Sequence, residues 1–194
     1  MKYFSTRNKQ KFFTFREAVL NGLAEDGGLF FPEFIPTFQK SFLKEIKNLS
    51  FREISFKTAS LFIDNEIPQN KLKEIIESAI YFDAPIVNLS NELNVLELFH
   101  GPTLAFKDFG AQFMARIMEY FVHQTTRELI ILVATSGDTG SAVANGFYGV
   151  EGIKVFILYP SGKVSTIQEK QLTTLDKNVT ALEIEGTFDD CQRL

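Results

Sequence analysis

The sequence contains one cysteine, Cys191, and no tryptophan among its 194 residues. A single cysteine excludes a disulfide framework and a cysteine-based zinc site, and it is typical of a protein from a reducing compartment such as the cytoplasm. The only histidines, His100 and His123, lie too far apart in sequence to indicate a histidine-rich metal site. The chain also lacks an apolar run of about 18 residues, so we expect no membrane-spanning helix.

Positive charge is not in excess, because 20 lysines and arginines stand against 24 aspartates and glutamates and give a net charge of −4. Nucleic-acid binding requires a concentrated positive patch, so no nucleic-acid partner is expected. Hydrophobic residues make up 45% of the sequence and charged residues 23%, which indicates a folded, globular chain. The 21 phenylalanines fall mostly at apolar positions of periodic segments, where we expect them to form the core.

Residues 1–85 are predicted to form a helical N-terminal domain that ends near Pro85. Capping-box patterns, in which a hydroxyl residue caps a helix and an acid three residues later reaches back, indicate the starts of two helices. A third helix is expected over about residues 69–82. The two capping boxes are Thr14 with Glu17 and Ser50 with Glu53.

Residues 86–194 alternate between short apolar runs and helical patterns. Continuous apolar runs of strand length are typical of a parallel sheet that is buried on both faces. The alternation predicts an α/β fold with a doubly wound parallel sheet, and the sheet is incomplete because it has only about three buried strands. We expect strands at 95–99, 129–134, 153–158 and 179–184, and helices at 103–123, 139–148, 165–175 and from a cap at Thr187.

The turn after the apolar strand 129–134 reads TSGDTG and is rich in glycine and hydroxyl residues. Such a turn between a parallel strand and a helix presents backbone N–H groups and the positive end of the helix dipole, which together can hold a carboxylate or a phosphate. An ordinary strand-to-helix turn that is capped by threonine or aspartate would explain the same residues equally well.

Lys107 is expected in the first turn of the apolar helix 103–123. Its positive charge is unfavourable at the positive end of a helix dipole. Phe106 and Phe109 would desolvate the amine, and a desolvated lysine is a nucleophile that can form a Schiff base. The alternative is a surface lysine that pairs with Asp108.

These two segments resemble motifs of one family. Residues 98–109, LFHGPTLAFKDF, are similar to the cofactor-lysine segment of the threonine synthase family, and residues 134–140, ATSGDTG, are similar to its substrate-binding loop. The agreement runs in order over essentially the whole chain. Further matches are residues 158–165 and 168–170 in a third block, and residues 22–23, 26–32 and 63–68 in the helical lead-in domain.

The resemblance implies a pyridoxal-phosphate (PLP) enzyme with the tryptophan-synthase-β-like fold, PLP fold type II. It implies the conversion of O-phospho-L-homoserine and water to L-threonine and phosphate. Lys107 would hold PLP as a Schiff base and move protons at Cα and Cβ of the substrate, with Phe106 and Asp138 beside the cofactor. The implied substrate-binding residues are Thr135, Ser136, Gly137, Thr139 and Gly140 for the carboxylate, and Lys163 and Ser165 for the phosphate.

The family's cofactor-phosphate loop, a Ser-Gly-Asn-Phe-Gly-type stretch, and its pyridine-nitrogen partner have no counterpart in this sequence. We therefore expect an N-terminal piece of a threonine synthase that is inactive alone. A β-replacement enzyme of the same fold, such as a cysteine synthase, is disfavoured by the helical lead-in domain and the Phe-Lys-Asp context. A non-catalytic module that binds anions or phospho-metabolites remains open, because its strands and glycine turn would have the same pattern.

Overall fold

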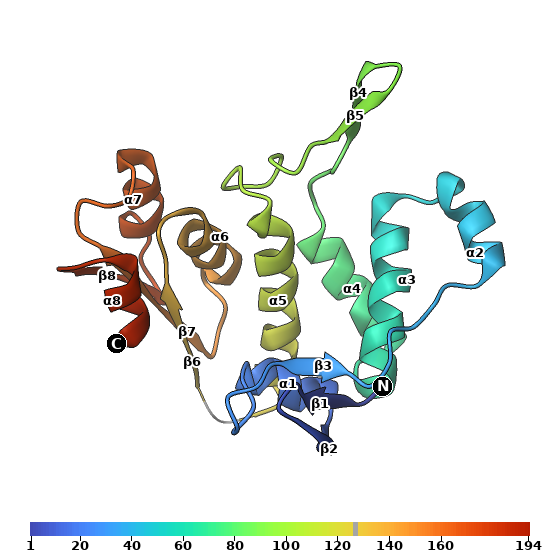
Figure 1. Cartoon of the computed structure of the whole chain (residues 1–194), viewed down its shortest axis with the longest axis horizontal. Coiled ribbons are helices and arrows are strands. Elements are labelled where there is room, and N and C mark those ends of the chain that lie inside the picture. The colour runs from blue at the N-terminus through green and yellow to red at the C-terminus, as the bar shows by residue number, and fades with distance from the viewer. Residues whose placement is uncertain (126–127) are drawn as a thin grey trace. The chain divides into compact units, whose positions relative to one another are not determined.

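The chain forms two compact units, Met1–Ser78 and Ala79–Leu194, in a computed structural model that describes residues 1–125 and 128–194 (Figure 1). The sequence had suggested a division near residue 85. No helix in the described ranges combines the length and the apolar character that crossing a bilayer requires.

The first unit combines helices with a small antiparallel sheet of strand order β2-β1-β3. The prediction of a purely helical region missed this sheet. Two of its strands have only three residues each, and β2, which reads NKQKFF, is exposed along almost its whole length and shows no apolar alternation. The elements are β1 Tyr3–Ser5, β2 Asn8–Phe13, α1 Phe15–Asn21, β3 Phe30–Pro32, α2 Lys40–Glu45, the 3-10 turns Ile46–Asn48 and Asp64–Glu66, α3 Phe51–Ile63 and α4 Gln69–Ala79.

Both predicted capping boxes of this unit are confirmed. The Thr14 hydroxyl accepts a hydrogen bond from the Glu17 amide at 3.1 Å, and the Glu17 carboxylate accepts from the Thr14 amide at 2.8 Å. Ser50 and Glu53 make the same reciprocal pair at the start of α3. Each box satisfies backbone donors that the first turn of a helix leaves without partners.

The second unit contains a three-stranded parallel sheet of order β6-β7-β8, as predicted. Helices α6 and α8 lie on opposite sides of β6 and β7 (Figure 1), so both faces of the sheet carry helices, as a doubly wound fold requires. The elements are β6 Leu129–Ala134, α6 Asp138–Phe147, β7 Ile153–Pro160, α7 Thr166–Thr173, β8 Val179–Ile184 and α8 Phe188–Arg193. The expected cap Thr187 is present on α8, and Ser165, expected as the first residue of a helix, is instead the N-cap of α7.

The segment before this sheet differs from the prediction in two places. The strand expected at 95–99 is instead β5 Leu93–Leu96, which pairs antiparallel with β4 Ile86–Ser90 in an exposed hairpin. The helix expected from residue 103 begins later, as α5 Lys107–Val122. The preceding residues form turns, and Leu104 takes a left-handed backbone with φ of 62° that a helix does not accommodate.

The core of the second unit lies where α5 packs against α6 and where α6 packs against the sheet. Ala115, Phe121, Phe147 and Val155 have at most 1% of their surfaces exposed. In contrast, β6 lies at an edge of the described sheet, and the side chains of Ile130 and Leu132 on it are 57% and 69% exposed. Aliphatic residues and a few phenylalanines therefore fill a core between the helices and leave an apolar strand uncovered.

The expectation that most phenylalanines form the core is wrong. Within the described residues only Phe82, Phe121 and Phe147 are buried, and others, such as Phe34 and Phe106, are more than half exposed.

Two glycines in adjacent helices form a matched test of the α5–α6 packing. A Cβ at Gly146 would lie 2.9 Å from the carbonyl oxygen of Ala111, whereas a Cβ at Gly110 would meet nothing within 4 Å. We expect Gly146→Ala to lower the free energy of unfolding by about 1–3 kcal/mol, because backbone cannot move aside cheaply. Gly110→Ala should raise the free energy of unfolding by about 0.5–1 kcal/mol. Chemical denaturation measures both, and equal effects would contradict this description of the packing.

The uncovered strand β6 leads us to expect self-association of the chain. An unpaired strand edge with apolar side chains is a template for pairing with another chain. Ile130→Lys combined with Leu132→Lys should shift sedimentation velocity profiles toward the monomer. Ile167→Lys on helix α7 is the control, because Ile167 is 74% exposed but does not lie on a strand. An equal shift for the control would show that apolar exposure in general causes the association.

Candidate functional site

The loop of residues 135–140 joins the carboxyl end of β6 to the start of α6, and a buried threonine holds it together from within. Thr135 is only 1% exposed, and its hydroxyl oxygen accepts hydrogen bonds from the amides of Gly137 at 3.0 Å and Gly140 at 2.9 Å. The same hydroxyl donates to the Gly137 carbonyl at 3.2 Å. The Thr135 side chain therefore shapes the loop and uses its hydrogen bonds there.

Three backbone N–H groups of this loop are available as hydrogen-bond donors. Within the described residues, no acceptor is found for the backbone amides of Ser136, Asp138 and Thr139. They belong to the first turn of a ten-residue helix, where the dipole contributes positive potential. The arrangement can bind a carboxylate or a phosphate, as the sequence pattern suggested.

Gly137 is the one position of the loop that must be glycine on two grounds. Its φ of 144° is a backbone conformation that other residues rarely adopt. A Cβ at this position would also lie 2.4 Å from the side-chain nitrogen of Gln168. A side chain from α7 thus packs directly on the loop backbone.

Asp138 contacts the same glutamine. Its carboxylate Oδ1 accepts a hydrogen bond from Gln168 Nε2 at 2.6 Å. Gln168 in turn accepts from the amide and the hydroxyl of Ser165, at 3.2 Å and 3.0 Å, as the partner in the capping box of α7. The third sequence block is therefore connected to the loop through Gln168, a residue that lay in a matched block and had no predicted role.

The two residues predicted to bind a substrate phosphate differ in their surroundings. The Ser165 hydroxyl caps α7 and accepts from the Gln168 amide at 3.3 Å, so it already has a structural partner. Lys163 is exposed, and its backbone amide donates to the Pro160 carbonyl at 3.1 Å. Their role toward a substrate stays a prediction, and the side chain of Lys163 is the one with more freedom to meet a ligand.

Lys107 is the first residue of α5. Its Nζ lies 4.9 Å from the centroid of the Phe106 ring, and that ring is itself 60% exposed. The expected pairing of Lys107 with Asp108 is wrong, because the Asp108 carboxylate is fully buried and turns to Thr103 instead. Phe106 thus provides a cation–π contact at the surface rather than the apolar enclosure that the sequence suggested.

The Asp108 carboxylate is the centre of a compact turn. It accepts hydrogen bonds from the Thr103 amide at 2.9 Å and the Thr103 hydroxyl at 2.6 Å. A Cβ at Gly101 would lie 2.4 Å from Asp108 Oδ2, so only glycine fits against the carboxylate. Both residues lie within the predicted cofactor segment, where Gly101 had no predicted role and Asp108 was considered only as a partner of Lys107.

The negative charge of Asp108 affects the pKa of the nearby Tyr81. Burial raises the pKa of Tyr81 above its ordinary value, the Asp108 carboxylate raises this pKa further, and Arg116 opposes the two effects. A nearby negative charge disfavours the phenolate, which is also negative.

The two predicted halves of the site lie on helices that pack together. Gln112 of α5 donates to Asn145 of α6 at 2.9 Å, and Ala111 lies against Gly146. No hydrogen bond or ion pair joins Lys107 to the loop 135–140 within residues 1–125 and 128–194. That both face one cleft stays a prediction.

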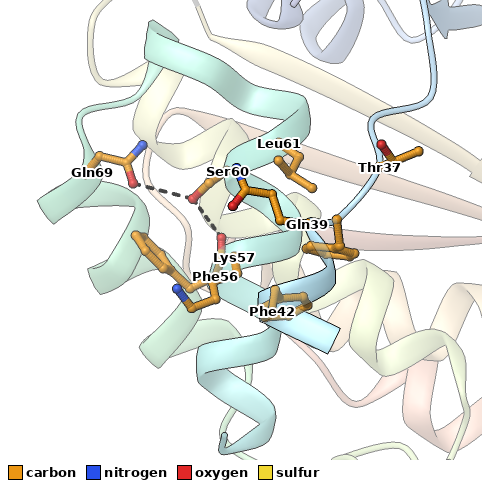
Figure 2. A pocket seen from close by; sticks show the side chains of 9 residues that line it. Thr37, Gln39, Phe42, Phe56, Lys57, Ser60, Leu61 and Gln69 are labelled. Carbon is orange, nitrogen blue, oxygen red and sulfur yellow. Dashed lines mark hydrogen bonds between the residues drawn. The ribbon is translucent and has the colours of Figure 1, made fainter. Parts of the chain in front are cut away.

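A pocket of about 430 Å³ lies elsewhere, in the first unit between α2, α3 and α4 (Figure 2). Phenylalanine side chains line it, and the Ser60 hydroxyl on its wall donates to the Phe56 carbonyl at 2.7 Å. None of the predicted site residues lines this pocket. The Lys107 segment and the loop 135–140, which carry an amine and open backbone amides, therefore stay the predicted site.

The turn around Asp108 can be tested by stability measurements. Asp108→Ala should lower the free energy of unfolding by about 1–3 kcal/mol, because the Thr103 amide and hydroxyl lose their acceptor in a buried place. Thr103→Ser is the control, since it keeps both donors, and it should change stability far less. An Asp108→Ala variant as stable as the original chain in urea denaturation would contradict the role of this carboxylate.

Comparisons with known proteins agree with the sequence motifs. Residues 2–80 match the family model for the threonine synthase N terminus. The threonine synthases of Escherichia coli (strain K12) and Schizosaccharomyces pombe (strain 972 / ATCC 24843) are 45% and 44% identical to this chain over its whole length. The chain spans only 45% and 41% of these two relatives.

Two solved structures show the same agreement in three dimensions. The crystal structure of threonine synthase from Escherichia coli has a TM-score of 0.91 at 45% identity, with 100% of this chain and 45% of that chain covered. The PLP-bound threonine synthase from Brucella melitensis has a TM-score of 0.91 at 40% identity, with 100% and 43% covered. These matches confirm the predicted resemblance and fold class. In sequence and in fold, the chain corresponds to the N-terminal part of threonine synthases.

Proposed function

We propose that this chain supplies the lysine and the substrate-binding loop of a PLP-dependent threonine synthase, which converts O-phospho-L-homoserine and water to L-threonine and phosphate. The observation that carries the proposal is the whole-length similarity to threonine synthases, which includes both segments. A threonine synthase from Brucella melitensis with the same fold is PLP-bound, which supports PLP as the cofactor. The single cysteine supports a cytoplasmic location.

Two features of the chain support this proposal, one toward the cofactor and one toward the substrate. Lys107 is engaged by the Phe106 ring alone and makes no ion pair in the described part of the chain, so its amine is available. The loop 135–140 offers three unused amides to an anion. When bound, PLP supplies an electron sink for charge that develops at the substrate's Cα and Cβ.

Each residue would then have a definite task. Lys107 would hold the aldehyde carbon of the cofactor, and after the substrate takes that place its freed amine would move protons at Cα and Cβ. The amides of Ser136 and Thr139 would orient the substrate carboxylate. Asp138 would lie beside the cofactor's 3′-oxygen, and Lys163 would approach the substrate phosphate, whose departure from Cγ precedes the addition of water at Cβ.

The activity can be tested in a chimera that joins residues 1–194 to the part of the Escherichia coli enzyme beyond the matched region. We expect the chimera to release phosphate and form threonine, and Lys107→Ala to lower kcat by about 10³-fold or more, since proton transfer alone contributes about 10²–10⁴-fold. Borohydride reduction of the loaded chimera should attach the pyridoxyl group to Lys107, as located by peptide mass spectrometry.

The control for this experiment is Lys154→Ala. Lys154 lies on β7 in the same unit and pairs with Glu128 at 2.9 Å, so its removal should leave both the label and the turnover in place. A label on another lysine in the Lys107→Ala chimera, with turnover retained, would contradict the assignment of Lys107. An unlabelled chimera that still binds inorganic phosphate would instead favour a non-catalytic anion-binding module.

A further inference from the structure

One capping box of this chain has an amide side chain where the others have a carboxylate. In each box the third residue of the helix reaches back to the backbone of the cap, and a carboxylate or an amide can do so equally well. Only the box of α7 uses an amide, among the described helices. The pairs are Thr14 with Glu17, Ser50 with Glu53, Ser165 with Gln168 and Thr187 with Asp190.

The glutamine on α7 is explained by the Asp138 carboxylate, which faces the nitrogen of its side-chain amide. Gln168 Oε1 accepts from the amide and the hydroxyl of Ser165, and its Nε2 donates to the Asp138 carboxylate at 2.6 Å. A glutamate could still accept from Ser165, but it has no hydrogen to donate to Asp138. Two carboxylates at that separation would repel each other.

The side chain of Gln168 also packs on the loop itself. A Cβ at Gly137 would lie 2.4 Å from Gln168 Nε2 and 2.7 Å from its Oε1, so the amide plane covers the loop backbone. Gln168 is therefore held at three places, by Ser165, by Gly137 and by Asp138, which fixes the orientation of its amide group.

Asp138 is the residue whose position depends on this contact. An aspartate in the first turn of a helix is attracted by the unused amides of that turn and by the dipole. Here its carboxylate is directed to α7, and the amides of Ser136 and Thr139 keep no acceptor within the described chain. Without the Gln168 amide, the carboxylate would be free to turn onto those amides and compete with a substrate carboxylate.

We propose that Gln168 is a positioning residue, which holds the Asp138 carboxylate away from the amides of the loop 135–140 and keeps them open. The proposal rests on the proposed function, because that function gives the open amides and Asp138 their tasks. In this role Gln168 acts through Asp138, to which it donates a hydrogen bond.

The test uses Gln168→Glu, which keeps the capping box of α7, removes the donor to Asp138 and adds a negative charge that repels the Asp138 carboxylate. The variant is made in the 194-residue chain and compared with the original sequence by NMR. We expect the backbone amide signals of Ser136 and Thr139 to shift downfield in Gln168→Glu, as the Asp138 carboxylate turns onto these amides. Asp138→Asn combined with Gln168→Glu should remove the shift, since the charge that moves is then absent. The matched control is Glu53→Gln, the reverse exchange in the box of α3, which should leave these signals unchanged.

The chimera supplies a second readout. Gln168→Glu should raise the KM for O-phospho-L-homoserine about 10-fold or more, the effect of losing one charge-assisted hydrogen bond, and should change the pH dependence of the visible cofactor band. Gln168→Leu, which removes the donor without adding charge, should raise the KM in the same direction.

The outcomes separate this inference from the proposed function. Unchanged amide signals in Gln168→Glu, or a shift that persists in the double variant, would overturn the positioning role. If the signals shift as expected and the chimera forms no coloured cofactor complex, the positioning role stands and the proposed function fails. If neither Gln168→Glu nor Gln168→Leu changes the KM of an active chimera, the loop amides do not depend on Gln168 and the proposal is wrong.

Discussion

The buried carboxylate of Asp108 determines where helix α5 begins and, through that, where Lys107 lies. A carboxylate that is removed from water requires hydrogen bonds to replace its hydration, and Thr103 supplies two of them. These bonds fold the residues before Lys107 into turns, so the helix cannot extend toward the N-terminus. Lys107 is the first residue of the helix, so the hydrogen bonds between Asp108 and Thr103 also fix the backbone that carries the Lys107 amine.

Two glycines of the chain serve the site in the same way. Gly101 gives room to the Asp108 carboxylate, and Gly137 gives room to the Gln168 amide, with a Cβ excluded at 2.4 Å in both places. Only Gly137 also needs its unusual φ. In each case a polar side chain from a helix lies on the glycine backbone, Asp108 from α5 on Gly101 and Gln168 from α7 on Gly137. The glycine is therefore required by close approach, and a substitution would displace a hydrogen-bonded group.

The sequence predicted well whatever depends on neighbours in the chain. The strand 129–134 and the caps Thr14, Ser50 and Thr187 follow from local patterns, and all are confirmed. The interactions that it missed join residues whose partners the pattern does not specify. Asp108 was expected to pair with its neighbour Lys107 but bonds back to Thr103, and Gln168 reaches Asp138 thirty positions away. Both contacts depend on the direction in which a side chain points, and the spacing of residues along a helix does not predict that direction.

The parallel topology itself explains why a carboxylate belongs at residue 138. Since β6 and β7 are adjacent and parallel, the helices that follow them, α6 and α7, begin at the same edge of the sheet. Their N-termini carry positive partial charges that repel each other. The Asp138 carboxylate belongs to the first turn of α6 and accepts a hydrogen bond from the first turn of α7, so it offsets the positive charge of both helix ends. Charge compensation and the opening of the loop amides therefore depend on one contact, and a change at either Asp138 or Gln168 alters the two together.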